Sequence, residues 1–133
     1  MVWDVRLDED TQVVVSSFNG LVTGPELMEA AEARIALGQE VGVELYIIDA
    51  AEMIAPKSTI MDVLDIPKEI YDDRQMSRTS LIAVVRPSHP GSAWIAEFYE
   101  NASVLRGWRV KTFDDFAAAL FWLQNYGERS EYS

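Results

Sequence analysis

Residues 44–64 read ELYIIDAAEMIAPKSTIMDVL and decide the fold, because they join an apolar strand to a helix through a short loop. The unbroken apolar run Leu45-Tyr46-Ile47-Ile48 predicts a strand over residues 44–50 that is covered on both faces and lies centrally in its sheet. Thr59 is expected to cap the short helix after the loop. In an open α/β sheet, the end of such a strand is the usual docking place for ligands and partners.

The chain before this stretch predicts a hairpin and then a helix. Residues 3–7 and 12–18 are rich in β-formers and are joined by a short acidic link, which favours antiparallel pairing. Thr23 and Glu26 then form a capping box, and Gly38 is expected to end the helix that they begin. The inward stripe of this helix is expected to hold Leu27, Met28, Ala31 and Ile35.

Three further elements follow the decisive stretch. Pro67 has no backbone N–H, so we expect a kink or break near Ile66. Residues 81–85 are continuously apolar and predict a second buried strand, and a helix is expected between Pro90 and Gly107. The residues expected to point inward are Ile66, Ile70 and Tyr71 near the kink, and Trp94, Ile95, Phe98, Tyr99, Ala102 and Leu105 in the later helix.

The chain closes with a strand over residues 108–113 and a helix that is expected to give way to a polar tail after Gln124. The predicted order is β-β-α-β-α-β-α-β-α. Strands separated by helices predict parallel pairing, and the hairpin adds an antiparallel edge. We therefore expect a single α/β domain over residues 1–125, with about five strands in a mixed sheet, four to five helices, and a tail at residues 126–133.

The composition is that of an ordinary globular protein, with 49% hydrophobic and 25% charged residues. The formal net charge is −11, which argues against nucleic acid as a partner because phosphate contacts need clustered Lys and Arg. No apolar run approaches the roughly 20 residues of a membrane span, and the start lacks the basic segment of a signal peptide, so we expect a cytoplasmic protein. The absence of cysteine excludes disulfides and thiolate chemistry.

Three sequence features together indicate a family. They are Phe18-x-Gly20 before Thr23, the buried strand that runs into Asp49, and the ending Gly107-Trp108-x-Val110-x-x-Phe113 followed by Ala119-x-x-Trp122-Leu123. In this order the pattern resembles the STAS superfamily, the fold of bacterial anti-sigma-factor antagonists, and more closely its divergent SpoIIAA-like branch. The resemblance covers about residues 1–125 and implies a STAS-like fold.

The resemblance also implies a non-enzymatic regulatory domain that binds a protein partner, or a second copy of itself as a homodimer. Met53 and Ile54 have no periodic place in a core, so the contact surface is expected on the loop and helix after the third strand. Family members that carry an Asp-Ser-Ser-Gly-type sequence there are switched by phosphorylation, whereas this chain has Ala55-Pro56-Lys57-Ser58-Thr59-Ile60. The expected contact residues are Met53, Ile54, Ser58 and Met61, and the positions that match the phospho-acceptor are Ser58 and Thr59.

A second function stays open, because the same branch is similar in fold to lipid-carrier domains. The chain would then carry or sense a small hydrophobic ligand in an apolar groove. Core packing accounts for most of the candidate lining residues without a ligand. These residues are Met53, Ile54, Ile60, Met61, Leu64, Trp94, Phe98 and Tyr99.

Asp49, Arg86 and His89 are the side chains best placed to hold a ligand or an anion, since all three stand at or just after predicted strand ends. A cap, an exposed strand end and a turn between two prolines explain them equally well. Ser88, His89 and Asp49 as a hydrolytic triad lack a nucleophile-elbow sequence. Because the chain also has no metal-ligand spacing and no Gly-rich phosphate loop, we expect no catalytic residue, metal or cofactor.

Overall fold

The sheet contains five strands that lie side by side in the order of the sequence. This computed structural model describes residues 2–131, and their side chains as far as residue 126. The first strand pairs antiparallel with the second, and all later neighbours pair parallel, which confirms the predicted mixed sheet. The strands are β1 (Trp3–Asp8), β2 (Val13–Leu21), β3 (Leu45–Ile54), β4 (Leu81–Val85) and β5 (Arg109–Phe113).

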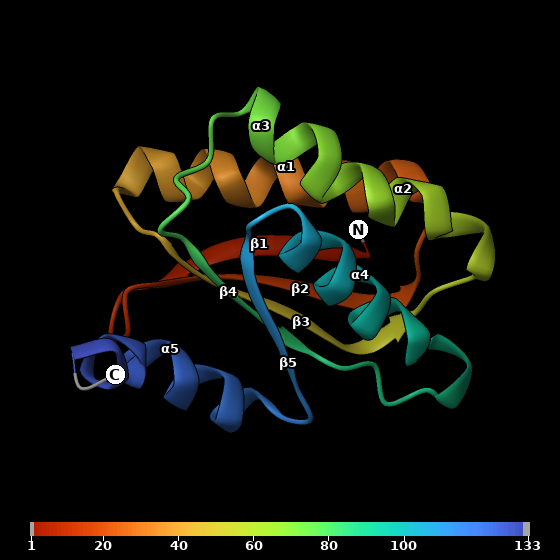
Figure 1. Ribbon diagram of the computed structural model, residues 1–133. Helices are drawn as coiled ribbons and strands as arrows, with labels where there is room; N and C mark the ends of the chain where they lie inside the picture. Colours follow the sequence, from red (N-terminus) through yellow and green to blue (C-terminus); the bar gives the residue numbers. More distant parts are fainter. Residues whose placement is uncertain (1, 132–133) are drawn as a thin grey trace.

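Helices cover both faces of this sheet, but unequally (Figure 1). The first four helices lie on one face, and the last helix packs alone on the other. Short 3₁₀ turns at Lys57–Thr59 and Pro90–Ser92 lead into the second and fourth of them. The helices are α1 (Gly24–Val41), α2 (Ile60–Asp65), α3 (Tyr71–Asp73), α4 (Trp94–Leu105) and α5 (Phe116–Glu131).

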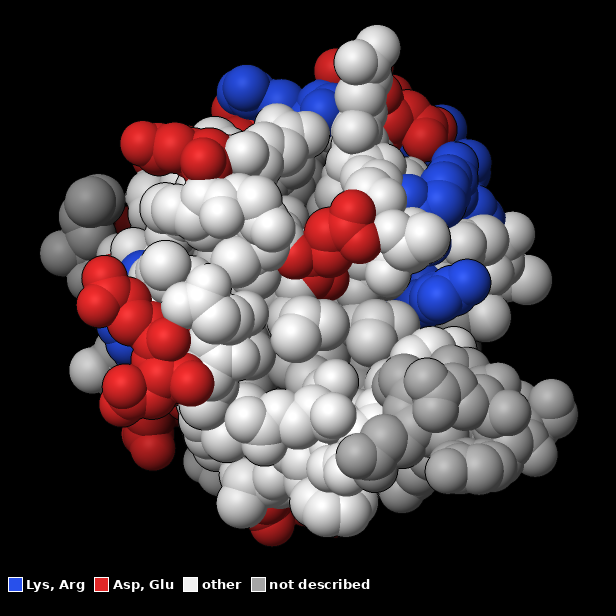
Figure 2. Space-filling view, turned by 90° about the vertical axis from the view of Figure 1, so that its left-hand side faces the viewer, with Lys and Arg blue, Asp and Glu red and all other residues white. Residues whose placement is uncertain are grey.

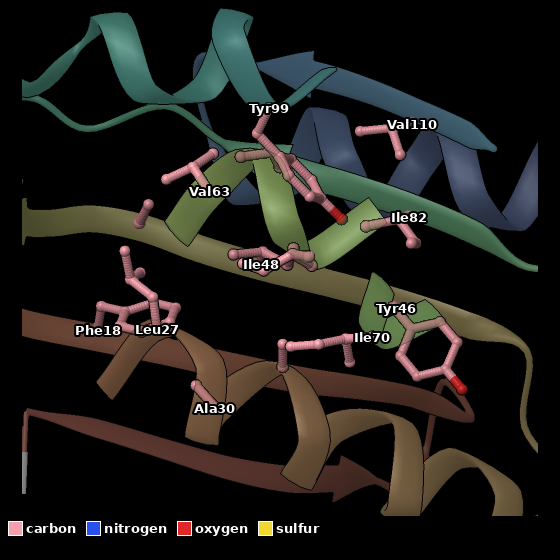
Figure 3. Packing of buried hydrophobic residues seen from close by; sticks show 14 of the residues in the cluster. Phe18, Leu27, Ala30, Tyr46, Ile48, Val63, Ile70, Ile82, Tyr99 and Val110 are labelled. Carbon is pink, nitrogen blue, oxygen red and sulfur yellow. The ribbon is translucent and has the colours of Figure 1, made fainter. Parts of the chain in front are cut away.

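The two faces of the sheet create two apolar cores, because successive strand residues point to opposite sides. On β3, Tyr46 and Ile48 belong to the larger core under α1 to α4, whereas Ile47 between them belongs to the smaller core under α5. Figure 3 shows side chains from strands and helices meeting in the larger core. The continuous apolar run that predicted a central strand is thus buried on both sides.

Helix α1 begins as predicted and ends four residues later than predicted. The Thr23 Oγ1 accepts from the Glu26 amide, and the Thr23 amide donates to the Glu26 carboxylate, so the capping box is formed. The C-cap is Gly42, with a φ of 72°, and not Gly38. Gly38 lies inside the helix, where a Cβ would stand 2.0 Å from the Tyr46 Oη. Its lack of a side chain therefore serves close packing and not helix termination.

Strands β2 and β3 both run further than predicted. After an irregularity between Ser17 and Asn19, their pairing resumes with Gly20 opposite Met53 and Leu21 opposite Ile54. The expected loop directly after Ala50 was wrong, because backbone pairing between the two strands continues to Ile54. This extension moves the end of β3 four residues along the chain.

Two predicted features of the helices take another form in the structure: the break near Pro67 and the end of the last helix. The predicted break at Pro67 appears as a π-helical turn, Ile66–Ile70, between α2 and α3, and Ile66, Ile70 and Tyr71 are buried as expected. Helix α5 continues past Gln124 to Glu131, so the predicted tail begins as helix, and residues 132–133 lie outside the described part.

The predicted inward face of α4 is partly wrong. Ile95, Tyr99 and Ala102 are buried, but Leu105 is 87% exposed at the end of the helix. Within residues 2–131, no helix combines the length and the apolar character needed to cross a membrane.

Candidate functional site

The end of β3 is held in place by hydrogen bonds to two neighbouring segments, the residue after β2 and the connection between β4 and α4. The Val22 amide donates to the Ile54 carbonyl at 3.0 Å. The Ala55 amide donates to the buried Ser92 Oγ at 2.9 Å, and the Ser88 Oγ donates to the Ala51 carbonyl at 2.8 Å. Because these bonds fix the strand end from both sides, the side chains around it are presented on a firm support.

Four large apolar side chains are exposed at this end, and we call them the edge patch: Leu21, Ile54, Ile60 and Met61. Leu21 and Ile54 are direct neighbours across the β2–β3 pair. Asp62 contacts Gly24, so the start of α2 lies against the start of α1, three residues after Leu21. Leu21 is 60% exposed and Met61 is 62% exposed. These four are half of the eight large apolar side chains that are exposed among the described residues.

The predicted contact residue Met53 does not belong to this surface. It is only 3% exposed and packs in the larger core. Simple alternation from Ile48 would turn it to the other face of the sheet. However, β3 has one residue more than β2 between the pairs Ser17–Asp49 and Asn19–Glu52, and this bulge turns Met53 inward and Ile54 outward. Ile54, Ser58 and Met61 are exposed as the prediction requires. The sequence did not single out Leu21, because the second strand was expected to end at Phe18 and the pairing of Leu21 with Ile54 depends on the extension of both strands.

Of the two candidate phospho-acceptors, only Ser58 is exposed. Thr59 is 2% exposed, and its hydroxyl donates to the Pro56 carbonyl at 2.7 Å. Thr59 is the N-cap residue of α2 as predicted, but its side chain makes no capping hydrogen bond because the hydroxyl is bonded to the Pro56 carbonyl. A 3₁₀ turn before the helix takes the place of that cap.

The surroundings of the edge patch are acidic. Residues 50–65 contain Glu52, Asp62 and Asp65 against the single base Lys57. Figure 2 shows the opposite end of the molecule, where β1 ends and β2 to β5 begin. Basic side chains gather there along the upper right, and the left carries mainly acidic ones. The basic side chains on that end are therefore separated from the edge patch by the length of the sheet.

Asp49, Arg86 and His89 lie near one sheet end but do not form one site. The Asp49 Oδ1 accepts from the Ala51 amide at 3.2 Å. Arg86 is paired with Glu97 and Asp114, and the Glu97 carboxylate raises its pKa. The His89 Nδ1 lies 3.4 Å from the Ser92 Oγ. No hydrogen bond links Ser88, His89 and Asp49 among the described residues, and the described part holds no cluster of three His, Asp or Glu side chains suited to a metal ion.

The predicted apolar groove is divided between the surface and the interior. Ile54, Ile60 and Met61 face outward, and Trp94 and Phe98 pack edge to face with ring centroids 6.2 Å apart. A small, partly open cavity of about 40 Å³ lies deeper in the larger core. Its lining residues are Phe18, Leu27, Arg34, Ile48, Ala50, Met53, Val63, Ile66, Val84, Ile95, Ala96 and Tyr99.

Arg34 is the functional candidate that the sequence analysis missed. It is 2% exposed on the inward side of α1 and donates to the Tyr71 hydroxyl at 3.1 Å. The Tyr71 and Tyr99 hydroxyls are hydrogen-bonded to each other. The signal was present in the spacing, because Arg34 follows Leu27 and Ala31 on the same helical face.

Comparison of the chain with protein-family models and with curated proteins identifies no relative. No model of a protein family matches the chain, and a search of curated proteins finds no match.

Proposed function

We propose that this chain is a cytoplasmic, non-enzymatic interaction domain of STAS-like type, which binds a protein partner through the edge patch. The observation that carries the proposal is the gathering of Leu21, Ile54, Ile60 and Met61 at one end of the fold. Large apolar side chains that are exposed together at one end of a fold, among polar residues, are typical of protein contact sites. The α/β architecture agrees with the fold that the STAS resemblance implies.

The charges indicate what kind of partner fits. The formal net charge of −11 opposes the approach of a second copy, so the occupant is another protein and not a homodimer partner. Glu52, Asp62 and Asp65 around the patch favour a contact surface with an apolar centre and a basic rim. Lys57 is the one base in this segment and weakens that preference only slightly.

Ser58 gives this surface a means of control. It is exposed between the end of β3 and Ile60, so a phosphate there would add about two negative charges beside the apolar side chains. Such a charge would add to the acidic surroundings that favour a partner with a basic rim. Ser58→Asp is therefore expected to strengthen partner binding, in the opposite direction from a change to the patch itself.

The test compares two variants that each replace two exposed large apolar side chains by serine. Leu21→Ser with Met61→Ser alters the edge patch, and Leu105→Ser with Phe121→Ser alters exposed apolar side chains elsewhere. A partner captured by the wild type is identified, purified and titrated against all three proteins. We expect the patch variant to lose at least about tenfold in affinity, as hot-spot truncation does, and the other variant to bind like the wild type.

Two results would contradict the proposal. Equal loss in both variants would mean that exposed apolar side chains bind without selectivity. A dimer mass in light scattering that the patch variant converts to a monomer would make a second copy the occupant.

A further inference from the structure

The two outer strands of the sheet differ along their outer sides (Figure 1). On β5, the Thr112 amide donates to the Glu100 carboxylate at 2.6 Å, so α4 satisfies part of that edge. On β1, among the described residues, no hydrogen bond from outside the β1–β2 pair reaches the backbone of Trp3, Val5 or Leu7. β1 is therefore the open edge of the sheet.

The register of β1 shows which of its backbone groups are free. The Val2 carbonyl accepts from the Asn19 amide at 2.8 Å, just before the strand begins. In an antiparallel pair, residues that exchange hydrogen bonds with the neighbouring strand alternate with residues that do not. Asp4 and Arg6 therefore use their backbone groups on β2. The residues whose N–H and C=O groups point away from the sheet are Trp3, Val5 and Leu7.

The side chains of β1 do not prevent a further strand from pairing. The strand contains no proline, no glycine and no bulge. Its apolar side chains, those of Trp3, Val5 and Leu7, pack against the larger core and are only partly buried. Between its first and last residues, the exposed charges are Asp4 and Arg6, one of each sign. An open edge of this kind is a template for pairing with another chain.

We propose that β1 pairs antiparallel with β1 of a second copy, about a two-fold axis at Val5, so that the two sheets join into one. Val5 then faces Val5, and Trp3 faces Leu7 of the other copy, so the three pairs exchange about six backbone hydrogen bonds. Asp4 of each copy lies opposite Arg6 of the other, in the pairs whose side chains are closer together. This proposal does not depend on the edge patch.

Charge selects this register over its neighbours. Because only every second residue has free backbone groups, the two strands can slide past each other only in steps of two residues. One step in one direction places Asp4 opposite Asp4, and one step in the other places Arg6 opposite Arg6, so like charges meet. The register centred on Val5 brings opposite charges together and uses the free backbone groups of all three residues in both copies.

The net charge of −11 acts against any contact between two copies, but the local charges differ between β1 and the edge patch. At the edge patch, Glu52, Asp62 and Asp65 of one copy would meet the same acids of the other. On β1, Asp4 and Arg6 sum to zero, and each meets its opposite. At physiological salt the screening length is about 8 Å, which weakens the repulsion between more distant acids. A second copy therefore fits β1 better than it fits the edge patch.

Sedimentation equilibrium of the full chain in about 150 mM sodium chloride tests the proposal, because long-range repulsion is screened at that concentration. We expect the mass to approach twice the 15.0 kDa of one chain as the protein concentration rises. Hydrogen exchange of the Val5 and Leu7 amides is expected to slow as the dimer forms. The Thr112 amide is the internal control, since its acceptor lies in the same chain. A mass of one chain at millimolar concentration would overturn the proposal.

Two charge reversals test the register. Asp4→Arg and Arg6→Asp each place like charges opposite each other, and each should weaken self-association at least about tenfold. An equimolar mixture of the two variants brings opposite charges together again, so it should form a mixed dimer about as tightly as the wild type associates. Arg109→Asp on β5 is the matched control for Arg6→Asp, because it makes the same change in net charge at an exposed residue, and it should associate like the wild type. If the mixture fails to associate, the strands do not pair in this register and the proposal is wrong.

Val5→Pro tests the backbone contact, because it removes the N–H group at the axis and leaves the hydrogen bonds between β1 and β2 in place. We expect this variant to fold and to stay monomeric, and the charge reversals decide the question if it fails to fold. Leu21→Ser with Met61→Ser should keep the dimer mass, since the edge patch takes no part in the pairing. A dimer that survives both Val5→Pro and the charge reversals, or that only the edge-patch variant dissociates, would overturn the assignment.

Discussion

At the scale of single residues, two arginines show how environment decides what a charge does. Arg86 lies near the surface and forms ion pairs with Glu97 and Asp114. Ion pairs at such a site contribute modestly to stability. Arg34 lies in the core with tyrosine hydroxyls as its neighbours. The sequence separates these roles only by place: Arg34 falls on the inward stripe of a helix, and Arg86 directly follows a strand.

The tyrosine beside Arg34 makes stability depend on alkaline pH. Burial raises the folded-state pKa of Tyr99, so above the unfolded value of about 10 the unfolded chain releases this proton and the folded chain keeps it. The contribution is therefore fully present below that pH and is lost as pH rises. We expect urea unfolding free energies to fall by up to about 1.4 kcal/mol per pH unit for this one group, and Tyr99→Phe to fall less steeply.

The pH range below the ionisation of tyrosine serves as the internal control for that measurement. Below about pH 9 the pH dependence of the two proteins should be the same, because tyrosines stay protonated there. Parallel curves above pH 10 would show that Tyr99 ionises alike in the folded and unfolded chains.

At the scale of elements, the sequence predicted the types and the order of the helices and strands well. It predicted the residues at which they end less well. Residues 81–85 were predicted as a strand and form β4 with the same bounds. A short apolar run with polar residues on both sides fixes where the strand begins and where it ends. β3 ran on to Ile54 because its extension depends on pairing with β2, which no local pattern encodes. The edge patch was predicted only in part for the same reason, since that pairing turns Met53 inward and places Leu21 beside Ile54.

Gly38 illustrates a contact between elements that propensity alone would misjudge. Alanine in place of glycine usually stabilises a helix interior by about 1 kcal/mol. Here the new Cβ would stand 2.0 Å from the Tyr46 Oη and 2.7 Å from its Cζ. We therefore expect Gly38→Ala to lower the unfolding free energy by about 1–3 kcal/mol, measured by urea denaturation, because α1 must move off β3.

The second half of that test removes the obstructing hydroxyl. Tyr46→Phe takes away the nearest atom but leaves the ring, so the double variant should recover part of the loss. Additive effects of the two changes would show that the clash is relieved elsewhere and that the spacing of α1 and β3 is not set by Gly38.

At the scale of the whole molecule, the helices are spread unevenly over the two faces of the sheet, and the charges are spread unevenly along the chain. The sheet is covered by several helices on one face and by α5 alone on the other (Figure 1). The charge of −11 is concentrated in residues 1–55, which hold eleven acids against Arg6 and the buried Arg34. The exposed part of this segment is thus almost purely acidic, and its self-repulsion acts against the folded state.

This repulsion predicts that salt stabilises the protein. Raising sodium chloride from about 10 mM to about 200 mM shortens the screening length to below about 10 Å, so the melting temperature should rise. Glu9→Gln with Glu40→Gln removes two exposed acids, and Glu40 lies in the last turn of α1, where a negative charge opposes the helix dipole. That variant should melt higher at low salt and gain less from added salt. A melting temperature that stays level or falls in the wild type would show that the surface ion pairs, which salt weakens, outweigh the repulsion among the acids.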